Sequence, residues 1–354
     1  MASNKLKTPE IYRKDWALNA TNTVKVDIDP SVMPSGLIRG FWVKLQSAAI
    51  TGFSSATTDY PKILRNITYG ASFPKHNVMT ALEGKFWDNV WTQLNRFAAP
   101  RTTPNASGFD ILYYLPFAWP GTDKYKAYRP KDTALLNINN KALPFISLNL
   151  GVLTDLATGA TACNVTVVVE ADYDPIVRPG MENPVNPVLS GDQPGRYLEF
   201  LSDQKADLAT TCMKTFVTGG PRECIGVVAR ELDNTGAEVS NIFTYGVATP
   251  SKFVFQKGDS DAYNPDEKVN LLDGISQQRF GIAPIAGYHY WFAARTGKLR
   301  DCVDLRDGGT FKLSMDNLAT TSNRVLQTLQ INTVDIPADV LAVHSAQLGV
   351  APGA

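Results

Sequence analysis

The sequence predicts a mainly all-β protein of two tandem jelly-roll β-sandwich domains, with a helix inserted in each. First, the second half of the chain repeats the plan of the first half. Second, short apolar segments with turn residues between them recur at roughly 8–12 residue spacing, which is typical of sandwiches and barrels. Third, 354 residues are enough for two domains that each bury a core.

The repeat is clearest in the closing strands of the two halves. Each half ends with two short apolar segments around a polar turn, then a loop, then a longer apolar segment. These segments are 135–138, 145–150 and 163–169 in the first half, and 302–305, 311–315 and 325–334 in the second. A duplicated β-domain explains this order.

Composition divides the chain into five parts. They are an N-terminal arm (1–22), a first jelly roll (23–175), a Pro-rich linker (176–196), a second jelly roll (197–337) and a C-terminal arm (338–354). The first arm is polar and basic, and the second is small, apolar and nearly uncharged. Closely spaced prolines cannot donate hydrogen bonds to a sheet, so the linker is expected to be semi-rigid.

In the first half, strict alternation over 24–29 predicts a half-buried strand, and apolar runs predict strands at 38–50 and 111–115. Apolar residues four apart predict one long amphipathic helix over 75–97. The residues of its apolar stripe are Val78, Leu82, Phe86, Val90 and Leu94.

In the second half, segments 224–232 and 239–245 flank Asp233–Gly236, which predicts a hairpin. Asn264 and Pro265 suit the start of a helix, whose expected buried residues are Val269, Leu272 and Ile275. The remaining apolar segments predict strands at 197–201, 213–217, 253–255, 280–285 and 288–294.

Charge and cysteine content narrow the class of protein. Basic and acidic residues number 34 each, so the net charge is zero, which argues against a protein that coats nucleic acid and favours self-association. Cys163, Cys212, Cys224 and Cys302 are expected to be buried thiols in a reducing compartment. The N-terminus has no hydrophobic signal region and no apolar run could cross a bilayer, so synthesis in a cytoplasm is expected.

The sequence contains few residues that favour an enzymatic function. Only three histidines are present, His76, His289 and His344, and no two have the spacing of metal ligands. His289 is expected to be a partly buried strand residue. The sharpest catalytic candidate is Ser260, which lies between a strand and a helix as the nucleophile of a hydrolase would. That arrangement requires a parallel α/β sheet, which the pattern of segments lacks.

A loop rich in side-chain oxygen atoms is a candidate calcium-binding site. Its candidate ligands are Asp259, Asp261, Asn264, Asp266 and Glu267. The spacing departs from the EF-hand because asparagine stands where glycine is required, and a solvated acidic loop explains the same residues. We therefore predict no catalytic, cofactor-binding or metal-binding residue, and calcium binding by Asp259, Asp261 and Asp266 stays an open alternative.

From about Thr23 to Pro337, this architecture resembles the double-jelly-roll major capsid proteins of tailless icosahedral viruses, particularly bacteriophages with an internal membrane. The resemblance rests on two tandem β-units, a helix in each, a linker and two terminal arms. Segments 287–291 and 297–301 are also similar to the late strands of such rolls. The long first helix has only a shorter counterpart, at 265–277.

The resemblance implies a structural protein of the virion, made in the host cytoplasm and without catalysis. It implies homotrimers that form pseudo-hexameric capsomers, with neighbouring capsomers, penton and minor capsid proteins as partners. It also implies an N-terminal arm that faces the membrane, and no sequence-specific nucleic-acid binding. Loop aromatics Trp119, Tyr125 and Tyr128 would then contact other subunits. Two alternatives remain: a glycan-binding β-sandwich adhesin, and a hydrolase that uses Ser260.

Overall fold

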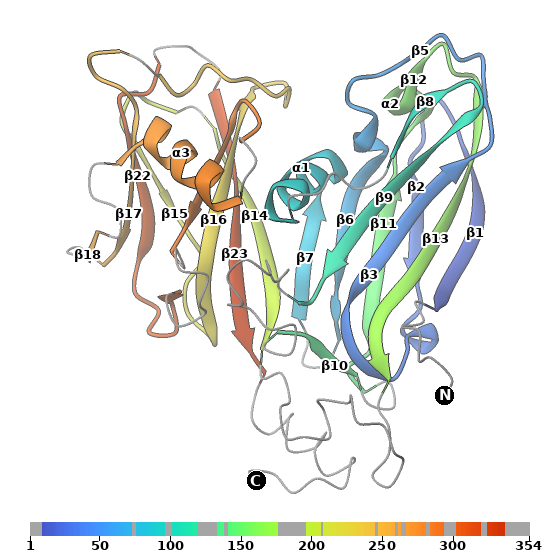
Figure 1. The fold of residues 1–354 in the computed structure, drawn as a ribbon, viewed down its shortest axis with the longest axis horizontal. Helices are drawn as coiled ribbons and strands as arrows, with labels where there is room; N and C mark the ends of the chain where they lie inside the picture. The colour runs from blue at the N-terminus through green and yellow to red at the C-terminus, as the bar shows by residue number, and fades with distance from the viewer. Residues whose placement is uncertain are drawn as a thin grey trace, which may run out of the picture.

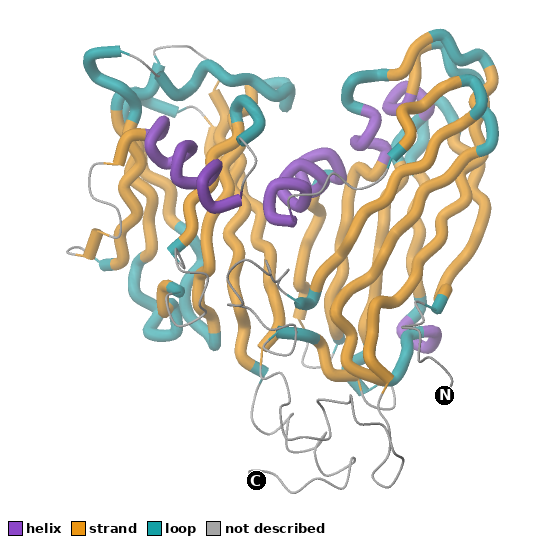
Figure 2. The backbone as a smooth tube through the Cα atoms, viewed as in Figure 1, coloured by secondary structure: helices purple, strands orange, loops and turns teal. Residues whose placement is uncertain are grey.

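The structure is a computed structural model of the whole chain. It describes residues 9–72, 76–95, 101–118, 133–137, 141–175, 196–206, 208–244, 247–258, 261–262, 267–280, 284–293, 302–319 and 324–336. Two blocks of long, upright strands stand side by side, and the α-helices lie toward one end of the strands (Figures 1 and 2). We call these blocks the first roll and the second roll.

The first roll precedes residue 176. Its elements are β1 (Glu10–Leu18), β2 (Val24–Ile28), η1 (Pro30–Val32), β3 (Gly36–Ser47), β4 (Ile50–Thr51), β5 (Ser55–Ala56), η2 (Tyr60–Ile63), β6 (Leu64–Ala71), β7 (His76–Leu82), α1 (Gly84–Asn95), β8 (Thr102–Asn105), β9 (Gly108–Pro116), β10 (Leu135–Asn137), β11 (Pro144–Leu150), α2 (Leu153–Leu156), β12 (Ala157–Thr158) and β13 (Ala162–Pro175).

The second roll follows residue 195. Its elements are β14 (Arg196–Ala206), β15 (Cys212–Thr215), β16 (Arg222–Asp233), β17 (Lys252–Lys257), β18 (Asp261–Ala262), β19 (Glu267–Lys268), α3 (Val269–Phe280), β20 (Tyr288–Phe292), β21 (Val303–Asp304), β22 (Phe311–Asp316) and β23 (Arg324–Asp335).

Strand pairing confirms the repeat. One sheet of the first roll has the order β1-β13-β3-β9, with β10 on β3, and the second roll has β14-β23-β16-β20, with β21 on β16. The facing sheets have the orders β2-β11-β6-β7 and β15-β22-β17-β18. Each strand in these orders therefore has a counterpart at the same position in the other roll, and α1 and α3 occupy corresponding places between counterpart strands. Both rolls are jelly rolls, as the sequence predicts.

Alternation of buried and partly exposed residues explains the facing sheets. In β11 and β22 every second side chain is buried, which is the period expected of a strand with one face on a core. The strands β16 and β23 are instead buried along almost their whole length, because both of their faces are covered.

The two rolls share one sheet and one core. Strands β7 and β14 pair in parallel where Met79 lies opposite Phe200, which joins strands of both rolls into a continuous nine-stranded sheet. The larger buried cluster starts inside the first roll and extends to Phe200, Tyr290 and Ile331 of the second roll. A second cluster, which includes Phe253 and Phe311, lies inside the second roll alone.

The long helix expected over 75–97 is wrong in its first half. Val78 and Leu82 belong to strand β7, and the helix begins only at Gly84. A spacing of four residues is also a multiple of the strand period, so these two positions fit both patterns. Gly84 lies so close to the backbone of Leu64 that a Cβ there would stand 2.7 Å from the carbonyl oxygen. This close approach fixes the point where strand gives way to helix.

The prediction of an N-terminal arm is wrong for Glu10–Leu18, because these residues form strand β1, which pairs with β13. Its charged residues suggested a free arm, but β1 is the outermost strand of its sheet, and charged side chains are common on such edges. Residues 1–8 lie outside the described part of the chain.

Three expectations for the second half are also corrected. The turn at Asp233–Gly236 is confirmed, but the described residues of its return segment make a single bridge, between Leu232 and Glu238. The helix begins at Val269 rather than at Asn264, because Glu267–Lys268 pairs with β17. Its Ile275 is exposed, whereas Val269 and Leu272 are buried as expected. Phe280 ends α3 and does not begin a strand.

The other expected strands are confirmed, with boundaries that shift by a few residues. All four cysteines are free thiols, and Cys163 and Cys224 are buried. Several expectations fall outside the described residues: the linker up to residue 195, the C-terminal arm, Asp259, Ser260, Asn264, Asp266, Trp119, Tyr125, Tyr128 and His344. The side chains of His76, Asp261 and Glu267 are likewise not described.

Candidate assembly surfaces

Aromatic side chains fill the centre of the contact between the rolls. The fully buried ring of Trp87 on α1 meets Phe200 of β14 edge-on, at a centroid distance of 4.9 Å. Trp87 Nε1 also donates a hydrogen bond of 2.7 Å to the carbonyl oxygen of Tyr114. Phe86 of the same helix packs against Tyr288 of β20, at 5.9 Å. Helix α1 therefore acts as a wedge between the two rolls (Figure 1).

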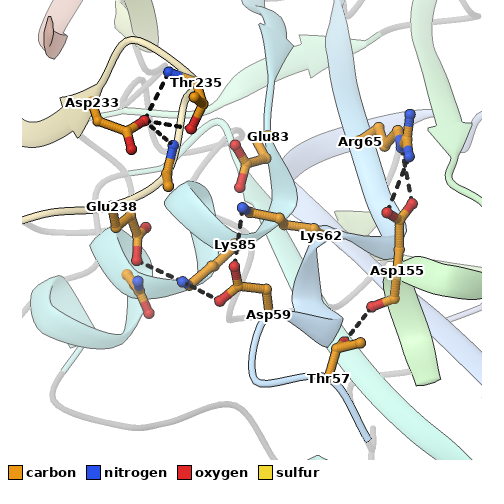
Figure 3. Close-up of polar contacts among 12 residues, drawn as sticks. Thr57, Asp59, Lys62, Arg65, Glu83, Lys85, Asp155, Asp233, Thr235 and Glu238 are labelled. Carbon is orange, nitrogen blue, oxygen red and sulfur yellow. Dashed lines mark hydrogen bonds and ion pairs between the residues drawn. The ribbon is translucent and has the colours of Figure 1, made fainter. Parts of the chain in front are cut away.

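Charged residues surround this aromatic centre and form what we call the inter-roll ion cluster: Asp59, Glu83, Lys85, Arg230 and Glu238. Lys85 Nζ lies 2.6 Å from a carboxylate oxygen of Asp59, in the first roll, and 2.6 Å from one of Glu238, in the second roll. Figure 3 shows both contacts. Arg230 of β16 makes ion pairs with Glu83 at 2.8 Å and Glu238 at 3.1 Å. Each cation of the cluster thus joins one roll to the other.

Burial makes this cluster matter for stability. The Arg230 side chain is only 3% exposed, and its guanidinium lies 4.4 Å from the ring centroid of Phe86. Burial alone would lower the pKa of Arg230, but attraction to Glu83 raises it above its ordinary value. Burial likewise acts to lower the pKa of Lys85, and its two carboxylate partners raise it. Both cations are therefore held charged in a partly buried contact.

A second group of polar contacts, centred on Asp155, connects loops at one end of the first roll. Arg65 of β6 donates two hydrogen bonds to the carboxylate of Asp155, at 2.9 and 3.0 Å, and the Thr57 hydroxyl donates to the Asp155 carbonyl oxygen (Figure 3). The Asp155 carboxylate also accepts from the Val152 amide at the start of α2. This fork-like geometry fixes the loop before η2, from which Asp59 reaches the ion cluster.

His289 is fully buried rather than partly buried, between two carboxylates. Its Nε2 lies 2.8 Å from Glu231 and its Nδ1 lies 3.3 Å from Asp273 of α3. Burial would lower the pKa of His289, but the hydrogen bonds to Asp273 and Glu231 raise it to about 9. A histidine held protonated in this way donates hydrogen bonds to both partners and is poorly suited to act as a general base at neutral pH.

The pH dependence of stability follows from this pKa. Below about 6.5, where histidine is protonated in the unfolded chain too, the stabilisation by His289 is fully present. We expect it to be lost as pH rises from 6.5 through about 9, with an upper bound of roughly 3 kcal/mol. Denaturant unfolding measured at several pH values checks this. A His289→Gln variant should lose most of that slope, and an unchanged slope would contradict the assignment.

The first roll presents a second, more exposed surface. We call it the outer face of the first roll; it comprises the side chains of Arg39, Trp42, Lys44, Tyr114, Glu170 and Asp172 on β3, β9 and β13. The partly exposed Trp42 lies 4.3 Å from Tyr114, ring to ring. Tyr114 donates a hydrogen bond of 2.8 Å to Asp172, which also pairs with Arg39 at 2.9 Å. Lys44 pairs with Glu170.

The described residues contain no candidate metal centre and no candidate membrane-spanning helix. No group of three histidine, cysteine or acidic residues that could hold a metal ion occurs in the described residues. No helix in the described ranges is long and apolar enough to cross a membrane. Sequence reasoning missed the inter-roll ion cluster, although one signal was available. Arg230 and Glu231 interrupt the otherwise apolar segment 224–232, and buried charges in such a run need partners.

Solved structures with the same fold are viral capsid proteins. The major capsid protein of Sulfolobus turreted icosahedral virus has a TM-score of 0.60 and 13% identity, with 94% of this chain and 98% of that chain covered. The major capsid protein P2 of bacteriophage PM2 has a TM-score of 0.54 and 12% identity, with 91% and 98% covered. No protein-family model and no curated protein matches the chain.

These likenesses establish the class of fold. The chain is a double jelly roll of the kind seen in those capsid proteins, over almost its whole length. The resemblance read from the sequence is therefore confirmed.

Proposed function

We propose that this protein is the major capsid protein of an icosahedral virus. The observation that carries the proposal is the duplicated, rigidly joined pair of jelly rolls, which covers 98% of the length of two viral major capsid proteins. A shell subunit must present fixed surfaces to its neighbours. The shared core and the inter-roll ion cluster supply that rigidity here.

The proposal includes assembly. Three copies with two rolls each give six similar blocks, and a trimer of this kind tiles a hexagonal lattice. Zero net charge favours close packing of many copies. Neighbouring capsomers, penton proteins and minor capsid proteins are the proposed partners, the virion is the proposed location, and residues 1–8 are proposed to face an internal membrane. The proposed role is structural and involves no catalysis.

The solution mass of the purified protein tests the proposal. Light scattering should give a species near three times 38.6 kDa that persists on dilution, and electron microscopy should show hexagonal capsomers or shells. A strict monomer at all concentrations and salt conditions would contradict the assembly. A trimer that binds glycans and never forms capsomers or shells would instead identify an adhesin.

A further inference from the structure

Arg324 is a buried cation without a counter-charge. It is the first residue of β23 and is only 8% exposed. Its Nε and Nη1 atoms are buried without a hydrogen-bond acceptor, and in the part of the chain that the structure describes its guanidinium makes no ion pair. Buried arginines are almost always paired, because a charge removed from water without a partner costs free energy. An exception of this kind needs a physical explanation.

The described acidic residues at this end of the neighbouring strands already have other partners. Asp233 lies directly opposite Arg324 on β16, but its Oδ1 accepts hydrogen bonds of 2.8 and 2.9 Å from two amides of the turn that follows. Glu231, two residues earlier on the same strand, lies 2.8 Å from His289. Asp203 of β14 pairs with a lysine of β15. None of these carboxylates is therefore left to neutralise Arg324.

A second cation lies at the same end of the sheet. Lys205 is the penultimate residue of β14 and is directly opposite Leu326 of β23. Residues opposite each other, and residues two apart on one strand, share a face of the sheet, so the side chains of Lys205 and Arg324 emerge on the same face. Among the residues described, Lys205 makes no ion pair either.

Cys212 shows that the two cations approach one point. It belongs to β15, in the sheet that faces β14 and β23. Burial raises the pKa of the Cys212 thiol, and the charges of Lys205 and Arg324 both act to lower it. The charge of Asp316 acts in the opposite direction, but Asp316 makes no ion pair with either cation in the described ranges. Lys205 and Cys212 are partly exposed, so small solutes can reach this point.

We propose that Lys205 and Arg324 form a binding site for a small oxyanion, a phosphate or a carboxylate group, beside Cys212. A guanidinium is planar and weakly hydrated and matches the geometry of both groups, and the lysine adds a second positive charge. The bound anion supplies the missing counter-charge where β14 and β23 of one sheet face β15 of the other. This site is separate from the inter-roll ion cluster and does not depend on the proposed capsid function.

Replacing Arg324 by methionine tests whether the buried charge is unpaired. In buffer without phosphate or carboxylate ions, R324M should unfold at the same denaturant concentration as the wild type or at a higher one, because the change leaves no partner behind. Removal of a paired buried arginine has the opposite effect. A clear loss of stability in R324M would therefore show that Arg324 has a structural partner, and would overturn the inference.

Binding is measured with inorganic phosphate and with acetate, at an ionic strength kept constant with sodium chloride. At least one of them should raise the unfolding temperature of the wild type and saturate at about 1 mM, and should bind R324M and K205M about 10-fold more weakly. R13M is the control, because Arg13 is 56% exposed and pairs with Glu10 on β1. The more effective ion identifies the group that is bound. Equal responses of R324M and the wild type would contradict the site.

Alkylation of Cys212 gives a readout that does not depend on stability. Iodoacetate is negatively charged and iodoacetamide is neutral, and peptide mapping separates Cys212 from the partly exposed Cys302. In the wild type, the rate with iodoacetate relative to iodoacetamide should exceed that in R324M by roughly 3-fold or more, and saturating phosphate should remove the difference. A ratio that changes neither with R324M nor with phosphate would overturn the inference.

Discussion

Replacing Arg230 by methionine is expected to destabilise the folded protein by about 3 kcal/mol, because Glu83 loses its only cation in the inter-roll ion cluster. The Arg230 side chain is 3% exposed and Glu83 is 24% exposed, so water cannot fully replace the lost partner. Methionine retains most of the aliphatic volume next to Phe86, which limits the loss of packing, but it also removes the hydrogen bond of 2.7 Å that Arg230 Nε donates to Gln327. Denaturant unfolding monitored by tryptophan fluorescence measures the change.

An exposed arginine provides the control for this prediction. Arg306 pairs with Asp304 at 2.9 Å and with Glu223 at 3.1 Å, but its side chain is 46% exposed, and Glu223 also keeps Arg196 as a partner. Its replacement by methionine should cost less than about 1 kcal/mol. The double variant R230M/E83Q should recover part of the stability, because the unpaired carboxylate is gone. Equal costs for R230M and R306M would show that the cluster contributes no more than surface charges.

Replacing Trp87 by alanine is expected to cost about 3–5 kcal/mol, because it opens a cavity at the contact between the rolls. The ring is fully buried against Phe200, and its loss also leaves the Tyr114 carbonyl oxygen without the indole donor. Both rolls share this core, so we expect the whole unfolding transition to move to lower denaturant concentration as one step.

Two variants separate the contributions at Trp87. W87F keeps an aromatic ring but removes the hydrogen bond, and should cost less than W87A. W91A removes a partly exposed ring that stacks on Trp87 at 5.4 Å, and should cost less than half as much as W87A. A transition that splits into two steps in W87A would mean that each roll is stable alone. No shift in any variant would contradict the wedge role of α1.

The duplication was predictable because β-strands leave a local signal. The alternation in β11 and β22 and the turns between closing strands can be read directly from residue types. The long helix was mispredicted because Val78 and Leu82 satisfy strand and helix periods alike. Strand β1 was missed because an edge strand of charged residues has the composition of a free terminus.

The candidate assembly surfaces could not be predicted, because they are formed by residues that are close in space but far apart in the sequence. Lys85 and Glu238 are far apart in the chain, and the parallel pairing of β7 with β14 and the packing of α1 against the second roll bring them together. The exposure of Leu271 is also invisible in the sequence, since an apolar residue on a helix is normally assigned to a core.

The continuous nine-stranded sheet has a mechanical consequence. Bending one roll relative to the other would break main-chain pairing, an aromatic core and buried ion pairs at the same time, so the angle between the rolls is set when the chain folds. If the chain builds a shell, as we propose, that shell cannot gain its curvature from a hinge inside the subunit. Every change of angle across the shell must then occur at the contacts between separate chains.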